Sequence, residues 1–311
     1  MKDLKIIIDT DIGTDIDDAY ALALALRGHL EILGISTVTG NSVARGKLAK
    51  KMLLLEQQDE IPVFAGKASS TGMTCESWAK EIDENTIVQD TSAMIEFYWH
   101  AIEKNSNGSL CIVGIGPLSN IAAIRDHDPT SFDERVTLLI MGGSIRKGYL
   151  GIKIPFPEYN IFKDKVSARK IFESRASLNI VPLDVTADLK LDAPGLAKLE
   201  SASGVDPLIK GLLDMTSLFR AKARRMPVLF DPGTIATLLD NEIGRFTSLI
   251  LYVSRLGFTR IMKDTVQGAI EKHVCLAFNK TRFYDLFFST LLGQDREIKA
   301  GLDHGENKGV S

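Results

Sequence analysis

The chain contains little cysteine, and its apolar runs are short. Cys75, Cys111 and Cys275 are the three cysteines among 311 residues, and no two of them have CxxC spacing. This set argues against a disulfide framework and a cysteine zinc site, and it predicts a reducing, cytoplasmic compartment. No apolar run approaches the ~20 residues that span a bilayer, and the first residues do not read as a secretion signal. We therefore expect no membrane association.

An excess of positive charge is also lacking. The chain has 37 Lys and Arg against 40 Asp and Glu, which gives a net charge of −3. No global basic field is present to attract nucleic acid or an anionic membrane. Hydrophobic residues make up 45% and charged residues 25%, which is typical of a globular protein. With no repeat, low-complexity stretch or marked boundary, residues 1–311 are predicted to form a single domain.

Short apolar runs rich in β-branched residues alternate with helical patterns. Helical spacing of apolar residues predicts helices over 17–28, ending near Gly28, and over 42–58. Continuous apolar runs suit strands that are covered on both faces of a parallel sheet. We expect strands at 5–9, 30–38, 61–65, 110–116, 136–143, 178–184, 249–253 and 274–278. The fold class is therefore α/β, with a mostly parallel, Rossmann-like central sheet flanked by helices.

Two segments have no periodicity. Residues 71–92, with Trp78, are predicted to be a long loop or lid, and residues 144–160 to be a second functional loop. Residues 186–230 are predicted to be mainly helical, with basic residues late in the segment, and the last ten residues to be frayed.

The strongest chemical signal is an acidic cluster after the first predicted strand. Five carboxylates lie within ten residues, at Asp9, Asp11, Asp15, Asp17 and Asp18. One or two acids at a helix start would cap the helix, but five repel one another unless a cation neutralises them. Oxygen ligands of this kind select Ca²⁺ or Mg²⁺. The cluster therefore predicts a metal site.

Two known metal-loop patterns fit the cluster poorly. An EF-hand requires glycine at the sixth position and glutamate at the twelfth, whereas this loop has Gly13 fifth and Tyr20 twelfth. A phosphohydrolase of the haloacid dehalogenase type would use Asp9 and Asp11, but Gly13 departs from its pattern. The phosphohydrolase is kept as a remote alternative.

A third pattern persists along the chain. The first loop, through Asp9, Asp11, Gly13, Asp17 and Asp18, resembles the opening motif of the inosine–uridine-preferring nucleoside hydrolases. Seven further motifs follow in that family's order: VTGN (38–41), PVFAG (62–66), GPLSNIA (116–122), MGG (141–143), PEYN (157–160), PLDVT (182–186) and FDP (230–232). One short motif would be weak, but eight in register make the resemblance specific.

The resemblance implies a Ca²⁺-dependent N-glycosyl hydrolase that cleaves a ribonucleoside to free base and ribose, as in nucleoside catabolism or salvage. It implies that Asp11, Asp18, Asp231 and the Ser119 backbone carbonyl hold the cation, with Asp15 a further candidate. Asp11 would also be the general base, and Asp17 is the second implied catalytic residue. The implied ribose contacts are Asp17, Asn41, Met141, Glu158 and Asn160. Family members are commonly homodimers or homotetramers, which we expect here.

The physical chemistry agrees with these implied roles. Cleavage of an N-glycosidic bond passes through an oxocarbenium-like sugar, whose positive charge a carboxylate-rich pocket stabilises. A metal lowers the pKa of bound water, and a carboxylate can then take its proton. A site that hydrogen-bonds sugar hydroxyls rejects deoxy analogues. Trp78 is a candidate to stack on the nucleobase.

Two departures from the family pattern affect the roles assigned to single residues, not the resemblance to the family. The first loop carries two extra residues around Thr14 and Asp15, which makes the roles of the acids locally ambiguous. Phe230 stands where many members have a histidine that protonates the departing base, and an apolar ring cannot donate a proton.

The departure at Phe230 leaves several alternatives open. The substrate could be a modified or other N-ribosyl compound, or the chain could bind a ribosyl ligand without turnover. A candidate proton source is the basic helix end, although a solvated helix face is the favoured interpretation of its charges: Arg220, Lys222, Arg224 and Arg225.

Overall fold

A computed structural model describes residues 4–262 and 269–294 of the chain. The predicted frayed carboxyl terminus lies outside these residues. The strands are β1 (Lys5–Thr10), β2 (Glu31–Thr37), β3 (Val63–Ala65), β4 (Leu110–Gly114), β5 (Thr137–Met141), β6 (Ser177–Val181), β7 (Gly244–Val253), β8 (Thr259–Ile261) and β9 (Glu271–Phe278).

Helices follow most of the strands. They are α1 (Asp17–Arg27), α2 (Ser42–Leu55), α3 (Thr91–Lys104), α4 (Ser119–His127), α5 (Pro129–Arg135), α6 (Tyr159–Lys163), α7 (Lys165–Glu173), α8 (Leu183–Thr186), α9 (Ala193–Ala202), α10 (Pro207–Ala223), α11 (Phe230–Leu239) and α12 (Lys280–Leu291), with short 3₁₀ helices η1 (Glu76–Ala79), η2 (Glu84–Thr86) and η3 (Tyr149–Gly151).

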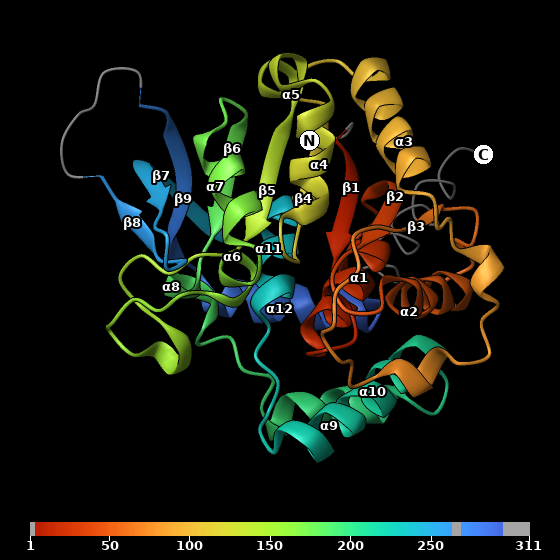
Figure 1. The fold of residues 1–311 in the computed structure, drawn as a ribbon. Helices are drawn as coiled ribbons and strands as arrows, with labels where there is room; N and C mark the ends of the chain where they lie inside the picture. Colours follow the sequence, from red (N-terminus) through yellow and green to blue (C-terminus); the bar gives the residue numbers. More distant parts are fainter. Residues whose placement is uncertain (1–3, 263–268, 295–311) are drawn as a thin grey trace, which may run out of the picture.

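The described strands form one nine-stranded sheet in the order β3-β2-β1-β4-β5-β6-β9-β7-β8 (Figure 1). Pairs from β3 through β6 to β9 are parallel, whereas β7 runs antiparallel to both β9 and β8. This confirms the predicted α/β class with a mostly parallel central sheet. The predicted strands all exist, but β8 was not expected, and β7 begins five residues earlier than predicted.

Both faces of the sheet are buried beneath helices. In β1, Ile6 and Ile8 point into one hydrophobic cluster with α1, α2 and α10–α12, whereas Ile7 points into a second cluster with α3, α4 and α7. All three isoleucines are at most 1% exposed. Alternation between two covered faces explains why β1 reads as a continuous apolar run. Helix α1 ends at Gly28, as predicted.

The order of the strands in the sheet reverses between β1 and β4: β2 and β3 lie on one side of β1, and β4, β5 and β6 lie on the other. The chain leaves β1 toward β2 on one side, and β4 returns to pair with β1 on the other. Such a switch point opens a crevice beyond the strand ends, where ligands bind in open α/β sheets. The acidic loop that follows β1 therefore lies at the position that this topology favours for a site.

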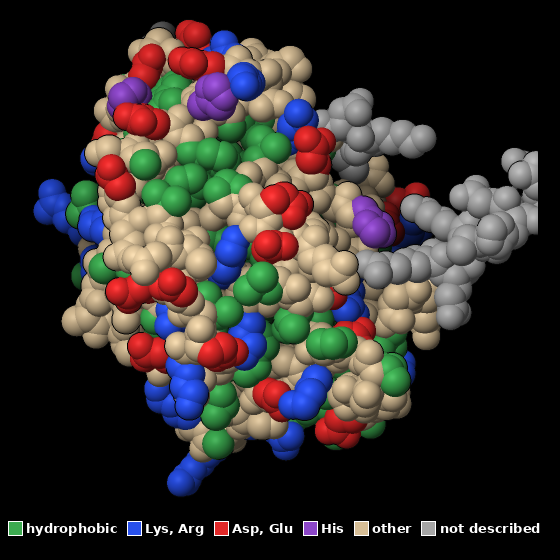
Figure 2. All heavy atoms as spheres, turned by 90° about the vertical axis from the view of Figure 1, so that its right-hand side faces the viewer, with side chains coloured by type: hydrophobic (Ala, Val, Ile, Leu, Met, Phe, Trp, Pro, Cys, Tyr) green, Lys and Arg blue, Asp and Glu red, His purple; other side chains and the backbone are tan. Residues whose placement is uncertain are grey.

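Surface and segment properties agree with a globular chain. On the face shown in Figure 2, acidic and basic side chains are interspersed. None of the described helices is both long enough and apolar enough to cross a membrane. The predicted lid segment, residues 71–92, contains η1 and η2, and Cys75 and Ala79 within it are buried.

Candidate functional site

A cleft of about 410 Å³ lies beyond the carboxyl ends of the parallel strands, a size typical of small-molecule sites. One part of its wall is acidic and polar, and another is apolar and aromatic. The lining residues are Asp11, Thr14, Asp15, Asp17, Asp18, Ile115, Met141, Tyr149, Leu150, Glu158, Tyr159, Asn160, Leu183, Ala187, Arg225, Val228, Phe230 and Asp231.

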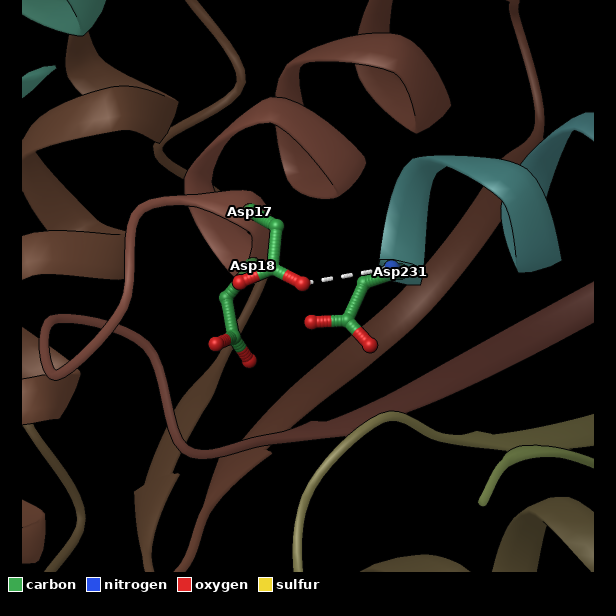
Figure 3. Close-up of side chains that lie close together, drawn as sticks. All are labelled: Asp17, Asp18 and Asp231. Carbon is green, nitrogen blue, oxygen red and sulfur yellow. Dashed lines mark hydrogen bonds between the residues drawn. The ribbon is translucent and has the colours of Figure 1, made fainter. Parts of the chain in front are cut away.

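Three carboxylates from two helices converge at this cleft. Asp17 and Asp18 lie in the first turn of α1, and Asp231 lies in the first turn of α11. One oxygen of each lies within 4.8 Å of the others, and each residue is 4% exposed. Figure 3 shows the three side chains directed toward one another, with the Asp231 backbone N–H donating to Asp17 Oδ2 over 3.4 Å.

Capping of α1 does not account for Asp17 and Asp18. The residue that caps α1 is Ile16, and no side chain makes a capping hydrogen bond there. Asp18 instead accepts a hydrogen bond of 2.5 Å from the Thr10 hydroxyl. Burial, reinforced by neighbouring carboxylates, raises the pKa of Asp17, Asp18 and Asp231 well above its ordinary value. Without a compensating cation, ionising them together would be costly.

The residues present therefore fit a hard divalent cation. All three offer carboxylate oxygens, the ligand type that Ca²⁺ and Mg²⁺ prefer. The amino-terminal ends of α1 and α11 carry only a partial positive charge, which is too little to balance three carboxylates. Asp11 lies at the same cleft, and burial raises its pKa to about 6. The three carboxylates that lie closest together are thus those of Asp17, Asp18 and Asp231. Asp18 and Asp231 were expected as ligands, whereas the resemblance implied Asp11 as the third acid and not Asp17.

A buried arginine, which the sequence analysis missed, holds the acidic loop. Arg45 of α2 is 0% exposed, and its Nε donates to the Thr39 carbonyl at 2.8 Å. Its Nη1 donates to the carbonyls of Asp11 and Ile12, and its Nη2 donates to the Thr14 hydroxyl at 2.8 Å. The guanidinium also lowers the pKa of Asp11 against the effect of burial. A planar, five-donor group suits this task better than lysine.

Gly13 shapes the same loop. Its φ of 104° lies in the left-handed region, and a Cβ there would lie 2.3 Å from Leu48 Cδ1. The Gly13 carbonyl accepts from the backbone N–H groups of Thr74 and Cys75. A side chain at this position would strain the backbone and displace the α2 packing beneath the loop.

Asp9 is buried beneath the site and forms hydrogen bonds with neighbouring segments. It is fully buried, and Oδ1 accepts from Ser36 Oγ at 2.5 Å and from Asn120 Nδ2 at 2.8 Å. Burial raises its pKa to about 7. Asn120 in turn accepts from the Lys67 N–H at 2.9 Å. Asp9, in β1, is therefore bonded to β2 directly and, through Asn120, to the segments that follow β3 and β4. It is not among the residues that line the cleft.

The loop over residues 144–160 supplies part of the polar wall. Glu158 caps α6, because its side chain accepts from the backbone N–H groups of Asn160, Ile161 and Gly143. Burial raises the Glu158 pKa to about 7. Asn160 Nδ2 donates to the carbonyls of Ile115 and Met141 at 3.1 and 3.2 Å. These bonds fix the amide, and its oxygen makes no hydrogen bond with the described residues.

The apolar wall combines this loop with the chain around α11. Tyr149 and Phe230 meet edge to face, with ring centroids 6.2 Å apart. The Tyr149 hydroxyl oxygen accepts from the Tyr159 N–H at 2.9 Å. Burial raises the pKa of Tyr149. At the mouth, Arg225 forms an ion pair of 2.7 Å with Asp15.

Three residues expected at the site are not among those that line the cleft. Asn41 caps α2 by accepting from the Ala44 N–H at 3.1 Å. Ser119 begins α4, and its hydroxyl donates to Asp164 at 2.7 Å. Trp78 packs in η1, with Lys51 Nζ 4.3 Å from its ring centroid.

The family model of the inosine-uridine preferring nucleoside hydrolases matches residues 6–285. Uridine nucleosidase 1 of Arabidopsis thaliana is 29% identical over 70% of this chain and 67% of its own length. The pyrimidine-specific ribonucleoside hydrolase RihA of Salmonella agona is 28% identical over 80% of this chain and 83% of its own length.

A solved structure shares the fold. The purine-preferring ribonucleoside hydrolase of Gardnerella vaginalis superposes with a TM-score of 0.78, covering 93% of this chain and 98% of its own, at 22% identity.

Proposed function

The chain belongs to the inosine-uridine preferring nucleoside hydrolase family and is an N-glycosyl hydrolase, and from this premise we propose that it cleaves ribonucleosides to free base and ribose with a bound Ca²⁺. One observation carries the proposal: buried carboxylates from the first turns of α1 and α11 converge at the cleft. Family membership argues against the phosphohydrolase and against a ribosyl-binding protein without turnover.

In the proposed site, Asp17, Asp18 and Asp231 hold the cation with Asp11 beside them. Their buried oxygens give the support for this ligand set, and Ser119 remains an implied ligand from the family resemblance alone. When bound, Ca²⁺ supplies positive charge that permits the carboxylates to ionise together and lowers the pKa of a water molecule in the site.

The side chains then divide the work of hydrolysis. Asp11 takes the proton of the attacking water, because it lies in the cleft beside the ligand group. The amide oxygen of Asn160 and the carboxylate of Glu158 accept hydrogen bonds from ribose hydroxyls. The ring of carboxylates stabilises the positive charge that develops on the sugar as the glycosidic bond breaks.

The aromatic wall receives the nucleobase in this arrangement. Tyr149 and Phe230 present ring edges and faces beside Leu150 and Val228, and such surfaces bind a flat heterocycle. The sugar then lies toward the acids, and the base lies toward the apolar end. Ribosides are preferred over 2′-deoxyribosides, because a missing hydroxyl leaves buried polar groups unpaired.

A panel of purine and pyrimidine nucleosides tests the proposal. Mass spectrometry should detect free base and ribose from at least one ribonucleoside with Ca²⁺, and none with a chelator. Asp11→Asn should lose roughly 100-fold or more in kcat. The control Asp214→Asn, which changes an exposed acid on α10, should keep wild-type activity. An intact panel with Ca²⁺ bound would refute the proposed substrate class.

A second candidate substrate is a modified or other N-ribosyl compound. Phe230 favours it, because the position that lies beside the base carries a ring without a proton to donate. Such a compound would have a leaving group that departs without an acid. It is detected in the same panel by including synthetic ribosides with activated leaving groups.

Two further features complete the proposal. We place the enzyme in the cytoplasm, because Cys75, Cys111 and Cys275 are all free and buried, as suits a reducing compartment. We also propose a homodimer or homotetramer, which the family resemblance implies. Sedimentation analysis of the purified chain decides the assembly.

A further inference from the structure

A single positively charged side chain lines the described part of the cleft, at its mouth and beside the acidic loop. Among the described lining residues, Arg225 alone is a lysine, arginine or histidine. Of the four basic residues at the end of α10 and just beyond it, the other three, Arg220, Lys222 and Arg224, do not line the cleft. The neighbouring wall residues Val228 and Phe230 offer no donor.

The Arg225 side chain is held in place by two contacts. Its Nη2 forms an ion pair of 2.7 Å with Asp15 Oδ2, and its guanidinium lies 5.0 Å from the ring centroid of Phe219. Asp15 belongs to the two extra residues of the first loop, so this pair joins the acidic loop to the end of α10. The remaining N–H groups of Arg225 make no hydrogen bond with the described residues.

Hydrolysis without an acid at Phe230 requires another way to relieve charge on the base. When the C1′–N bond breaks, its electron pair leaves with the base nitrogen, and the sugar takes up hydroxide from water. We propose that Arg225 stabilises the departing nucleobase as an anion, by hydrogen bonds and charge, until solvent water returns a proton to it. This inference rests on the proposed function.

Tyr149 is the competing donor at the same wall, and its environment suits the role less well. Its oxygen accepts from the Tyr159 N–H at 2.9 Å, which leaves the O–H proton as a neutral donor without a positive charge. Burial raises its pKa, so the phenol gives up its proton less readily than usual. Arg225 needs to transfer no proton, since its charge is permanent.

The inference defines a class of leaving group. A guanidinium favours rings that carry oxo groups and depart as anions, such as pyrimidine-2,4-diones and 6-oxopurines. It gives no help to a ring that must be protonated before it leaves, such as adenine. The share of this discrimination that Arg225 supplies is what its substitution would remove.

The test compares leaving groups of different basicity. Wild type, Arg225→Met and Arg225→Lys are assayed with uridine and with p-nitrophenyl ribofuranoside, whose leaving group is a stable anion. Arg225→Met should lose roughly 10- to 100-fold in kcat on uridine and less than about 3-fold on the activated riboside. Arg225→Lys should recover part of the loss. Arg220→Met, which changes an exposed arginine in the last turn of α10, is the matched control.

A binding measurement gives a second readout. The affinity for free p-nitrophenolate, as its anion, should fall roughly tenfold or more in Arg225→Met and stay unchanged in Arg220→Met. An equal loss of kcat on both substrates would overturn the inference, as would a leaving-group-dependent loss in Tyr149→Phe with none in Arg225→Met. A wild type that cleaves no riboside at all would instead overturn the proposed function and this inference with it.

Discussion

Removal of divalent cations should destabilise the protein more near neutral pH than in mild acid. In the chelated protein, the folded-state pKa values of Asp11, Asp17, Asp18 and Asp231 are raised above those of the unfolded chain. A carboxyl group with a raised folded pKa contributes stability at low pH, and that stability is lost as pH rises through the folded value. Each of the four therefore favours unfolding as it is forced to ionise.

The magnitude can be worked for Asp11. Its pKa rises from an ordinary 3.8 to about 6, which corresponds to about 3 kcal/mol of unfolding free energy lost above that pH. The other three act in the same direction. Bound Ca²⁺ opposes this loss of stability. At a free concentration 100 times its Kd, Ca²⁺ adds about 2.7 kcal/mol to the unfolding free energy. At lower pH it must displace protons, so it contributes less.

Thermal unfolding at about pH 7 and about pH 5, with Ca²⁺ and with chelator, measures this difference. We expect Ca²⁺ to raise the Tm by roughly 4 °C at the higher pH and by clearly less at the lower. Asp231→Asn should abolish most of the Ca²⁺ effect, whereas Asp214→Asn should leave it intact. An equal Ca²⁺ shift at both pH values would refute the reasoning.

Three further predictions concern other parts of the account. Arg45→Met should lower the unfolding free energy by roughly 3–5 kcal/mol in urea titrations and weaken Ca²⁺ binding, because buried carbonyls lose their donors; Arg45→Lys should do so less. Burial lowers the pKa of Lys272 to about 8, so the stability of wild type relative to Lys272→Met should rise as pH increases from about 8 toward 10. Asn160→Ala should reduce the preference for uridine over 2′-deoxyuridine roughly tenfold in kcat/KM.

The buried parallel strands could be read from the sequence, because burial on both faces makes them continuous apolar runs. Strand β1 is the clearest case, with three isoleucines between the two clusters. The antiparallel edge was harder. The first half of β7 alternates exposed and partly buried residues, and β8 has three residues with two exposed. Such short, half-solvated strands carry little periodic signal.

The candidate site divides in the same way. The acids after β1 were visible because their number exceeded what capping uses, and Asp231 followed from a motif in register. Arg45 was not visible, since its partners lie 31 to 34 residues away along the chain or in a different loop. Trp78 stays a prediction: a lone aromatic in an aperiodic segment suggested a base platform, and in the structure its ring lies against Lys51 and outside the described lining of the cleft.

Calcium binding to the wild-type chain and to variants of the converging acids tests the central claim most directly. Isothermal titration of metal-free protein should give one Ca²⁺ per chain, with the heat lost in Asp18→Asn and in Asp231→Asn and retained in Asp214→Asn. Circular dichroism shows whether each protein is folded. A folded wild type that binds no Ca²⁺ would contradict a divalent ion shared between α1 and α11. Equal Ca²⁺ binding by all three folded variants would contradict it as well.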